Sequence, residues 1–225
     1  MPMESTLQFI SKLRRAGCDP FRILTFLEFR RQLRNCESVL DIGCGEASSL
    51  RWFQLQRLVG LEGYQPSYAK ARLNKTHHEV VLGDARQLED YFQANQFDAC
   101  IAIDLIEHLT PEEGVALAQS MERIARKKSI IFTPNGFLEQ KHTEADDLQH
   151  HHSGWEPRDM ERLGYQVTGM LGPRRLRGEY HVLKGNPKVL WGLISLLGHW
   201  FWTRRHPAAA AALLCVKTKA PASAL

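Results

Sequence analysis

The chain has 225 residues, a net charge of +4, 44% apolar residues and 24% charged residues. These values are ordinary for one globular domain with a sizeable core, and the charge is too mild to demand a nucleic-acid partner. The first residues lack the basic start and apolar centre of a signal peptide, and the odd number of cysteines indicates reduced thiols. A cytoplasmic location is therefore expected. The cysteines are scattered without the paired spacing of a metal site: Cys18, Cys36, Cys44, Cys100 and Cys215.

Residues 5–34 show the apolar spacing of helices, and Asp19-Pro20 divides this stretch into two short ones. We expect a helical segment over residues 1–35. Two roles are open for it: it covers an edge of the sheet that follows, or it forms a cap over a ligand pocket.

A glycine turn at Gly43 and Gly45 follows the short, apolar and β-branched residues 38–42, which predict a buried parallel strand. Neither glycine carries a Cβ atom, so the backbone can approach a ligand closely and offer it N–H groups. Ala47 is small enough for close packing of a helix predicted over residues 48–53, whose N-terminus would face the ligand. The pattern is typical of nucleotide-type sites, but a turn without any ligand has the same signal.

A second predicted strand, residues 58–62, ends in Glu62, about 20 residues after the glycine turn. A carboxylate in this place can accept hydrogen bonds from both hydroxyls of a ribose. The alternative is a solvated glutamate at a strand end. No Gly-Lys-Ser or Gly-Lys-Thr follows the glycines, which argues against a triphosphate site.

Strands and helices alternate along the middle of the chain, which indicates right-handed parallel crossovers. Thr110-Pro111-Glu112-Glu113 carries the signals of a helix start, with a cap, a proline at the first position and an acid at the third. A short helix is expected at residues 158–163. Further strands are expected at residues 80–82, 97–104, 129–133, 164–169 and 212–217.

Four motifs in order resemble those of class I S-adenosylmethionine-dependent methyltransferases: Asp41-x-Gly43-x-Gly45, then Glu62, then Gly83-Asp84-Ala85, then the strand that ends at Asp104. The resemblance covers residues 36–170, roughly, and implies S-adenosylmethionine as the cofactor. It also implies an α/β fold, a Rossmann-like three-layer sandwich whose mostly parallel seven-stranded sheet has an antiparallel last strand. We expect this methyltransferase domain over residues 36–219.

The resemblance implies a role for each motif. Asp41 and the glycine turn would hold the methionine end of the cofactor, and Glu62 would bind the ribose. Asp84 would face the adenine amino group, Ala85 would offer a backbone N–H to the ring, and Asp104 would lie beside the sulfonium and the substrate. An NAD-dependent oxidoreductase fits less well, because the Gly-Asp-Ala element follows the methyltransferase pattern. The implied cofactor-binding residues are Asp41, Gly43, Cys44, Gly45, Glu62, Gly63, Asp84, Ala85, Asp104 and Leu105.

Substrate chemistry is expected around three short motifs, residues 106–109, 133–136 and 151–155, which together resemble a little-characterised microbial branch of the same class. In one hypothesis, His108 or His151 is a general base that takes a proton from a substrate hydroxyl, because imidazole titrates near neutral pH. This hypothesis makes both histidines candidate catalytic residues.

A second hypothesis places a divalent metal on Asp104, Glu107, His108 and His151. Small-RNA 3′-terminal 2′-O-methyltransferases look similar here, but they carry Glu where this chain has Asp104. The structural alternative is that Glu107 and His108 only cap a helix and hold the neighbouring loop, with no metal in the protein.

An uninterrupted apolar segment, residues 189–202, lies between basic residues and before the last predicted strand, in a helical insertion expected over residues 185–205. It is too short to span a bilayer comfortably. One interpretation is a helix packed over the sheet or the mouth of the active site. The other is an interfacial helix in peripheral contact with a membrane, because its aromatic and basic residues suit the headgroup zone.

The sequence as a whole predicts a methyltransferase that modifies oxygen on a small-molecule or lipid- or glycan-linked acceptor, in the cytoplasm or on a membrane surface. One alternative is a metal-assisted RNA 2′-O-methyltransferase, and another is a regulatory protein that binds the cofactor without catalysis. The acceptor itself is not predicted, because acceptor pockets are built from loops that vary on one scaffold.

Overall fold

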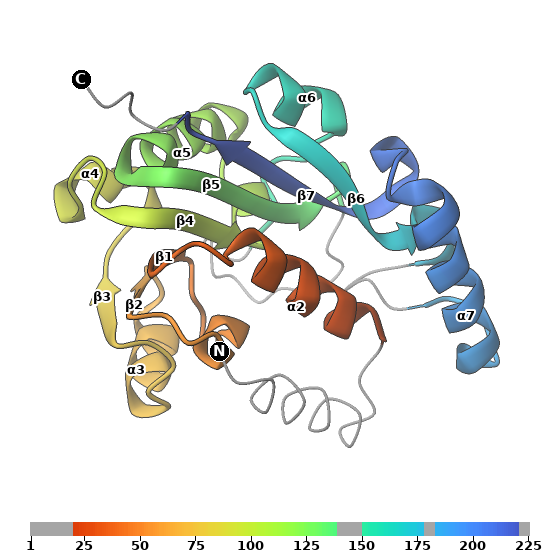
Figure 1. The fold of residues 1–225 in the computed structure, drawn as a ribbon, viewed down its shortest axis with the longest axis horizontal. Helices are drawn as coiled ribbons and strands as arrows, with labels where there is room; N and C mark the ends of the chain where they lie inside the picture. Colours follow the sequence, from red (N-terminus) through yellow and green to blue (C-terminus); the bar gives the residue numbers. More distant parts are fainter. Residues whose placement is uncertain (1–19, 139–149, 178–182, 221–225) are drawn as a thin grey trace.

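A computed structural model describes residues 20–138, 150–177 and 183–220, and every structural statement below concerns these residues. Seven strands form one sheet in the order β3-β2-β1-β4-β5-β7-β6. The last strand, β7, runs antiparallel to both neighbours, whereas the pairs from β3 to β5 are parallel (Figure 1). The predicted α/β fold is confirmed. The strands are β1 (Ser38–Ile42), β2 (Arg57–Glu62), β3 (Glu79–Leu82), β4 (Phe97–Ile103), β5 (Ala125–Pro134), β6 (Gln166–Pro173) and β7 (Ala210–Thr218).

Apolar side chains of the central strands alternate between two core clusters, one on each face of the sheet. Leu40 and Cys100 pack on the face covered by α5, whereas Val39 and Ile101 pack on the other face with α2. The sheet is therefore the middle layer of three. The helices are α2 (Pro20–Gln32), α3 (Gln65–Leu73), α4 (Leu88–Tyr91), α5 (Pro111–Ile124), α6 (Pro157–Arg162) and α7 (Lys188–Gly198).

Helix α2 covers a face of the sheet rather than an edge (Figure 1). Phe26 and Phe29 are buried, and the Phe29 ring meets Phe132 of β5 edge-on at 5.7 Å between centroids. The first of the two predicted N-terminal helices lies outside the described residues. The segment thus supplies one layer of the sandwich.

The helix predicted over residues 48–53 is wrong in kind: this stretch forms only the short 3₁₀ turn η1 (Ser49–Trp52). Ser48 caps the turn, and its hydroxyl also donates to Asp41 at 2.6 Å. Leu50 is fully buried in the core on the α2 side. Ser48 and Leu50, which a packing helix would need, therefore cap the turn and fill the core instead.

The start of α5 has the predicted geometry. The Thr110 hydroxyl accepts the Glu113 N–H at 3.3 Å, and the Glu113 carboxylate accepts the Thr110 N–H at 3.0 Å. This capping box satisfies two groups that would otherwise lack helical partners. Two of the described helix residues on the inner face, Leu117 and Met121, then pack against the sheet.

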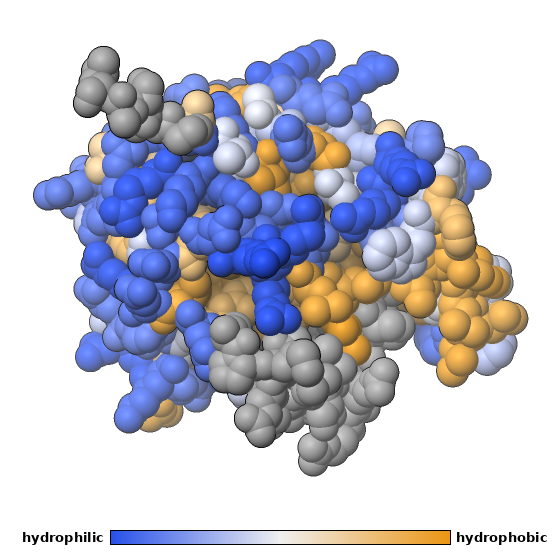
Figure 2. Space-filling view, viewed as in Figure 1, coloured by the Kyte–Doolittle hydropathy of each residue, from blue (hydrophilic) through white to orange (hydrophobic). Residues whose placement is uncertain are grey.

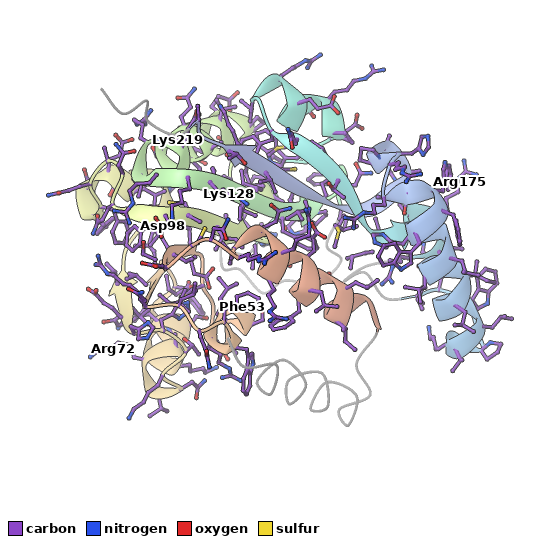
Figure 3. All side chains as sticks on the ribbon, in the orientation of Figure 1. Phe53, Arg72, Asp98, Lys128, Arg175 and Lys219 are labelled. Atoms are coloured by element: carbon purple, nitrogen blue, oxygen red, sulfur yellow. The ribbon has the colours of Figure 1, made fainter. Side chains whose placement is uncertain are left out.

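Amino-terminal ends of three strands are held together by Asp98. Its carboxylate accepts the N–H groups of Glu37 and Ser38 and lies 3.2–3.3 Å from Lys127 and Arg126. Figure 3 shows Asp98 at this end of the sheet, near Lys128. These bonds hold the pKa of Asp98 below its ordinary value against the opposing effect of burial.

Helix α7 continues into a π-helical turn, η7 (His199–Thr203), and the two lie along β6 at the side of the molecule. None of the described helices is both long and apolar enough to cross a membrane. The fully buried residues of this helix are polar: Ser195, His199 and Thr203 are at most 1% exposed. The largely buried His199 should therefore make stability depend on pH.

His199→Gln is expected to reduce the loss of stability in acid. Burial, and then the Arg204 charge, lower the pKa of His199 to about 4, although the nearby Glu28 acts in the opposite sense and Arg177 adds to the decrease. Because the unfolded chain binds a proton near pH 6.5, the native state loses about 2.5 kcal/mol between pH 7 and pH 4.5 through this group. Urea unfolding at both pH values should show that loss in the wild type but not in His199→Gln. His206→Gln, an exposed neighbour, is the matched control and should behave as the wild type.

Candidate functional site

The glycine turn after β1 has the backbone conformation that glycine allows. Gly43 and Gly45 have φ angles of +67° and +60°. A Cβ atom at Gly43 would lie 2.8 Å from Cδ1 of Leu105, whereas one at Gly45 would meet no atom within 4 Å. The turn therefore packs tightly against the end of β4 on one side and is open on the other.

The turn does not offer the N–H groups that the sequence suggested. Those of Gly43 and Cys44 both donate to the Leu61 carbonyl, at 2.8 and 3.1 Å, and that of Gly45 donates to Glu62 at 2.8 Å. The Cys44 side chain points toward Gly60, where a Cβ would lie 2.7 Å from its sulfur. What remains for a ligand is close approach to the open side of Gly45.

Glu62 ends β2 with both carboxylate oxygens bound to backbone. One accepts the Gly45 N–H and the other accepts the Tyr64 N–H at 2.9 Å. A carboxylate has about four acceptor positions, so two bonds leave capacity for ribose hydroxyls. Gly63 follows, and a Cβ there would lie 3.4 Å from the Gly83 carbonyl, which places the ends of β2 and β3 side by side. The residues present fit a ribose between these strand ends.

Asp84 follows β3 and caps the 3₁₀ turn η2 (Ala85–Gln87) by accepting the Arg86 N–H at 2.9 Å. The Arg86 guanidinium pairs with the same carboxylate, and this hydrogen bonding lowers the pKa of Asp84. The ionised carboxylate is about one-third exposed and can accept from an amino group such as that of adenine. Ala85 is half-buried at the start of η2. Both roles stay predictions.

Asp41 lies deeper than its predicted contact with the methionine end of the cofactor requires. Its carboxylate is 2% exposed, accepts the Ser48 hydroxyl and lies 3.0 Å from Nε2 of His77. The His77 side chain is fully buried and contacts the Thr76 hydroxyl through Nδ1 at 2.7 Å. Asp41 thus holds the residues around the turn in place through its contacts with Ser48 and His77. His77 was not predicted, and its only signal in the sequence is a pair of histidines before a strand.

Asp104 follows β4 with a φ of +48°, an uncommon conformation for a residue with a side chain. Its N–H donates to the Phe132 carbonyl at 2.9 Å, which fixes the residue between β4 and β5. Asp104 is exposed, yet the protein around it desolvates the carboxyl group enough to raise its pKa to about 6. The next residue, Leu105, is the one that packs on Gly43. The end of β4 therefore adjoins the glycine turn.

Glu107 lies in the 3₁₀ turn η3 (Ile106–His108) and is 3% exposed. Its carboxylate accepts the Thr133 hydroxyl at 2.9 Å, and its carbonyl accepts the N–H groups of His152 and Ser153. Burial, with the charge of Asp104, raises the pKa of Glu107 to about 8. An acid in this environment favours its neutral form unless a cation compensates it.

His108 and His151 lie against Glu107. The two imidazole rings meet edge to face at 4.8 Å between centroids. One ligand atom from each of Glu107, His108 and His151 lies within 4.8 Å of the others. The Nδ1 atoms lie 3.2 and 2.8 Å from the carbonyls of His150 and Leu138, so the tautomer that donates from Nδ1 puts the basic lone pair on Nε2. The structure thus brings together three of the four residues of the metal hypothesis.

The polar motifs around this cluster have structural roles as well. Ser153 and Trp155 both donate to the Ile106 carbonyl, at 3.2 and 3.3 Å, and so hold η3 in place. The Asn135 amide donates to three carbonyls before and at the start of β7, including Ala210 at 2.7 Å. The bonds of Ser153 and Trp155 tie the segment after β5 to the turn after β4, and those of Asn135 tie the end of β5 to the start of β7. They explain why the histidines converge although 43 positions separate them.

Comparison with known proteins agrees with this geometry. Residues 40–133 match the family model of the methyltransferase domain. The PH0226 protein of Pyrococcus horikoshii shares the fold with a TM-score of 0.56 and 17% identity, over 88% of this chain and 90% of that one. A SAM-dependent methyltransferase of Archaeoglobus fulgidus aligns with a TM-score of 0.55 and 18% identity, over 89% and 97% of the chains. No curated protein matches the chain.

A third solved structure with this fold is the magnesium protoporphyrin IX methyltransferase of Synechocystis with bound SAH. Its TM-score is 0.54 and its identity 14%, over 88% of this chain and 83% of that one. The matched segment contains the glycine turn, Glu62, Asp84 and the end of β4, where open α/β sheets bind ligands. Residues 40–133 therefore resemble a methyltransferase domain, and the cofactor that this match implies is S-adenosylmethionine.

Proposed function

We propose that this protein transfers the methyl group of S-adenosylmethionine to a hydroxyl oxygen of a small-molecule or lipid- or glycan-linked acceptor. The observation that carries the proposal is the pair of imidazoles, His108 and His151, beside the end of β4. That strand end adjoins the glycine turn through Leu105. An imidazole in this place would face the acceptor rather than the cofactor.

The cofactor supplies an electrophilic methyl group on a sulfonium. The chain contributes alignment first: Glu62 and the open side of Gly45 would hold the donor, and His151 would lie on the acceptor side. With the cofactor bound, its methyl carbon would be the electrophile for the acceptor oxygen, and its sulfur would leave as a neutral thioether. Nε2 of His108 or His151 takes the hydroxyl proton and later releases it to water. The methylated product would be an ether.

The metal-assisted form of this reaction is the second candidate, because Glu107 and the two histidines have the donor types and spacing of a metal site. Carbonyl partners at Nδ1 and the Thr133 hydroxyl on Glu107 are the outer contacts that orient metal ligands. A divalent cation here would polarise the acceptor hydroxyl and favour the ionised form of Glu107. This form would suit the paired hydroxyls at an RNA 3′ end, so RNA belongs among the acceptors to be tested.

The proposal includes a cytoplasmic location. Four described cysteines, Cys36, Cys44, Cys100 and Cys215, are free and buried. Burial raises the pKa of each thiol and keeps it unreactive. Fractionation of cells that express the full chain would test this location.

Calorimetric titration of the full chain is expected to show micromolar binding of S-adenosylmethionine and no binding of NAD. The N–H groups of the glycine turn are already bonded to Leu61 and Glu62, so they are not available to hold a pyrophosphate. Binding of NAD alone would contradict the methyltransferase assignment. The cofactor should also carry a labelled methyl group onto lipid, glycan, small-molecule or RNA extracts. Binding without transfer to any of them would favour the regulatory alternative.

Metal content separates the two forms of the reaction. Elemental analysis of the purified protein, together with activity after chelation, would exclude the metal-assisted form if both measurements were negative. A tightly bound divalent cation whose removal stops transfer would establish it instead.

A further inference from the structure

The α7–η7 helix presents an apolar face to the outside of the molecule. Seven large side chains on it are 50–80% exposed, far more than a packed helix allows. Figure 2 shows the resulting patch at the end of the molecule where Figure 1 places α7. We call the following residues the apolar face: Val189, Leu190, Leu193, Leu197, Trp200, Phe201 and Trp202.

The helix is held in this orientation by its polar side. Ser195 and Thr203 approach the backbone of β6 so closely that a Cβ at Gly172 would lie 2.4 Å from the Ser195 hydroxyl, and one at Gly169 would lie 2.0 Å from the Thr203 carbonyl. Rotating the helix to bury its apolar side would bring large side chains against Gly169 and Gly172, where the backbones are too close to leave room for them. The exposed face is therefore a fixed feature of the fold.

Basic residues flank the apolar face and acidic residues are absent from this part of the sequence. Lys184 and Lys188 are exposed before and at the start of α7, and Arg205 is exposed after η7. Arg175 lies on the same side of the molecule, beside α7 (Figure 3). No aspartate or glutamate follows Glu179 in the sequence. The face thus combines apolar and aromatic groups with cations at both ends.

We propose that the apolar face docks on an anionic phospholipid bilayer, with the α7–η7 helix lying in the plane of the headgroups. Tryptophan rings suit this zone because one part of the ring is apolar and the N–H can reach water. The flanking lysine and arginine residues would contact lipid phosphates. A second copy of the chain is a poorer partner, because two-fold pairing of the helices would bring one basic end against another.

Vesicle sedimentation tests this docking with the full chain and without cofactor or acceptor, so its result does not depend on the proposed methyl transfer. The wild type is expected to sediment with vesicles of phosphatidylcholine and phosphatidylglycerol, and at least tenfold less with phosphatidylcholine alone. Trp200→Ser with Phe201→Ser should reduce binding at least tenfold. Lys184→Gln with Arg205→Gln should abolish the preference for anionic vesicles.

The controls match exposure and charge elsewhere on the surface. Leu73→Ser removes a side chain that is 81% exposed on α3, and Arg72→Gln with Lys75→Gln removes two exposed cations there. Both should bind vesicles as the wild type does, and thermal unfolding should confirm that every variant folds. The proposal is overturned if the wild type does not bind anionic vesicles, or if the α3 controls reduce binding as much as the α7 variants do. It is also overturned if vesicle binding is absent and light scattering shows a dimer that Trp200→Ser with Phe201→Ser dissociates.

Discussion

Glu62→Ala is expected to weaken binding of S-adenosylmethionine at least a hundredfold. The carboxylate holds the N–H groups of Gly45 and Tyr64 at 2.8 and 2.9 Å and is the proposed acceptor for the ribose hydroxyls. Hydrogen bonds to a charged group contribute roughly 1.5–3 kcal/mol each, so the loss of two of them in the complex corresponds to about a hundredfold or more in affinity. Calorimetric titration measures this change directly.

Two further variants separate charge from general damage to β2. Glu62→Gln keeps the shape, but its NH₂ group would face a backbone N–H, so binding should fall nearly as far as in Glu62→Ala. Glu79→Ala removes an exposed glutamate at the start of β3, whose carboxylate is 3.9 Å from Arg57, and should leave affinity unchanged. Wild-type affinity in Glu62→Ala would show that the ribose lies elsewhere.

Strands were predictable from the sequence because most of them contain a short apolar run bounded by turn residues. The pattern at residues 129–133 predicted the second half of β5. The strand itself is longer, Ala125–Pro134, and its first half was missed because it is polar. The antiparallel last strand followed from the resemblance rather than from any local signal. Pairing direction depends on the whole path of the chain, which includes α6, β6 and α7.

The stretch after the glycine turn shows what a local pattern cannot reveal. From the sequence alone, Ser48 and Leu50 suit the start of a helix as well as they suit a capped turn with a buried leucine. The choice depends on Asp41, whose carboxylate binds the Ser48 hydroxyl, and on the buried His77 on its other side. These contacts join residues 7 and 36 positions apart. No periodicity in the sequence reports them.

The candidate acceptor site was predictable in composition but not in geometry. The sequence places Glu107 and His108 in one turn, whereas His151 lies beyond a loop of which residues 139–149 are outside the described structure. Its position is set by the bonds of Ser153 and Trp155 to Ile106. Side chains of this kind also fill ordinary cores, so their convergence could be known only from the fold.

His108→Ala and His151→Ala are expected to reduce methyl transfer by about 10²–10⁴-fold if the proton moves to one of these imidazoles, because general-base catalysis contributes that much. One of the two variants should then carry nearly the whole loss, while the affinity for S-adenosylmethionine stays within about twofold of the wild type, since neither ring is proposed to contact the cofactor. The measurements are kcat with the identified acceptor and calorimetric titration with the cofactor. His152→Ala, an exposed neighbour, is the matched control.

The pattern across Glu107→Gln distinguishes a base from a metal site. In the general-base form, the buried Glu107 is an uncharged neighbour of the base. The amide oxygen of the Gln variant can still accept the Thr133 hydroxyl, so this variant should retain most activity. In the metal-assisted form, the same variant should lose both bound metal and activity, and so should each histidine variant, because every ligand is needed for the same cation. Equal loss in all three variants with no metal bound in the wild type would contradict both forms and assign the cluster to the structure of the loop. A single sensitive histidine with an active Glu107→Gln protein is the result that the geometry favours, since only an imidazole here has both a fixed tautomer and a basic nitrogen directed away from its carbonyl partner.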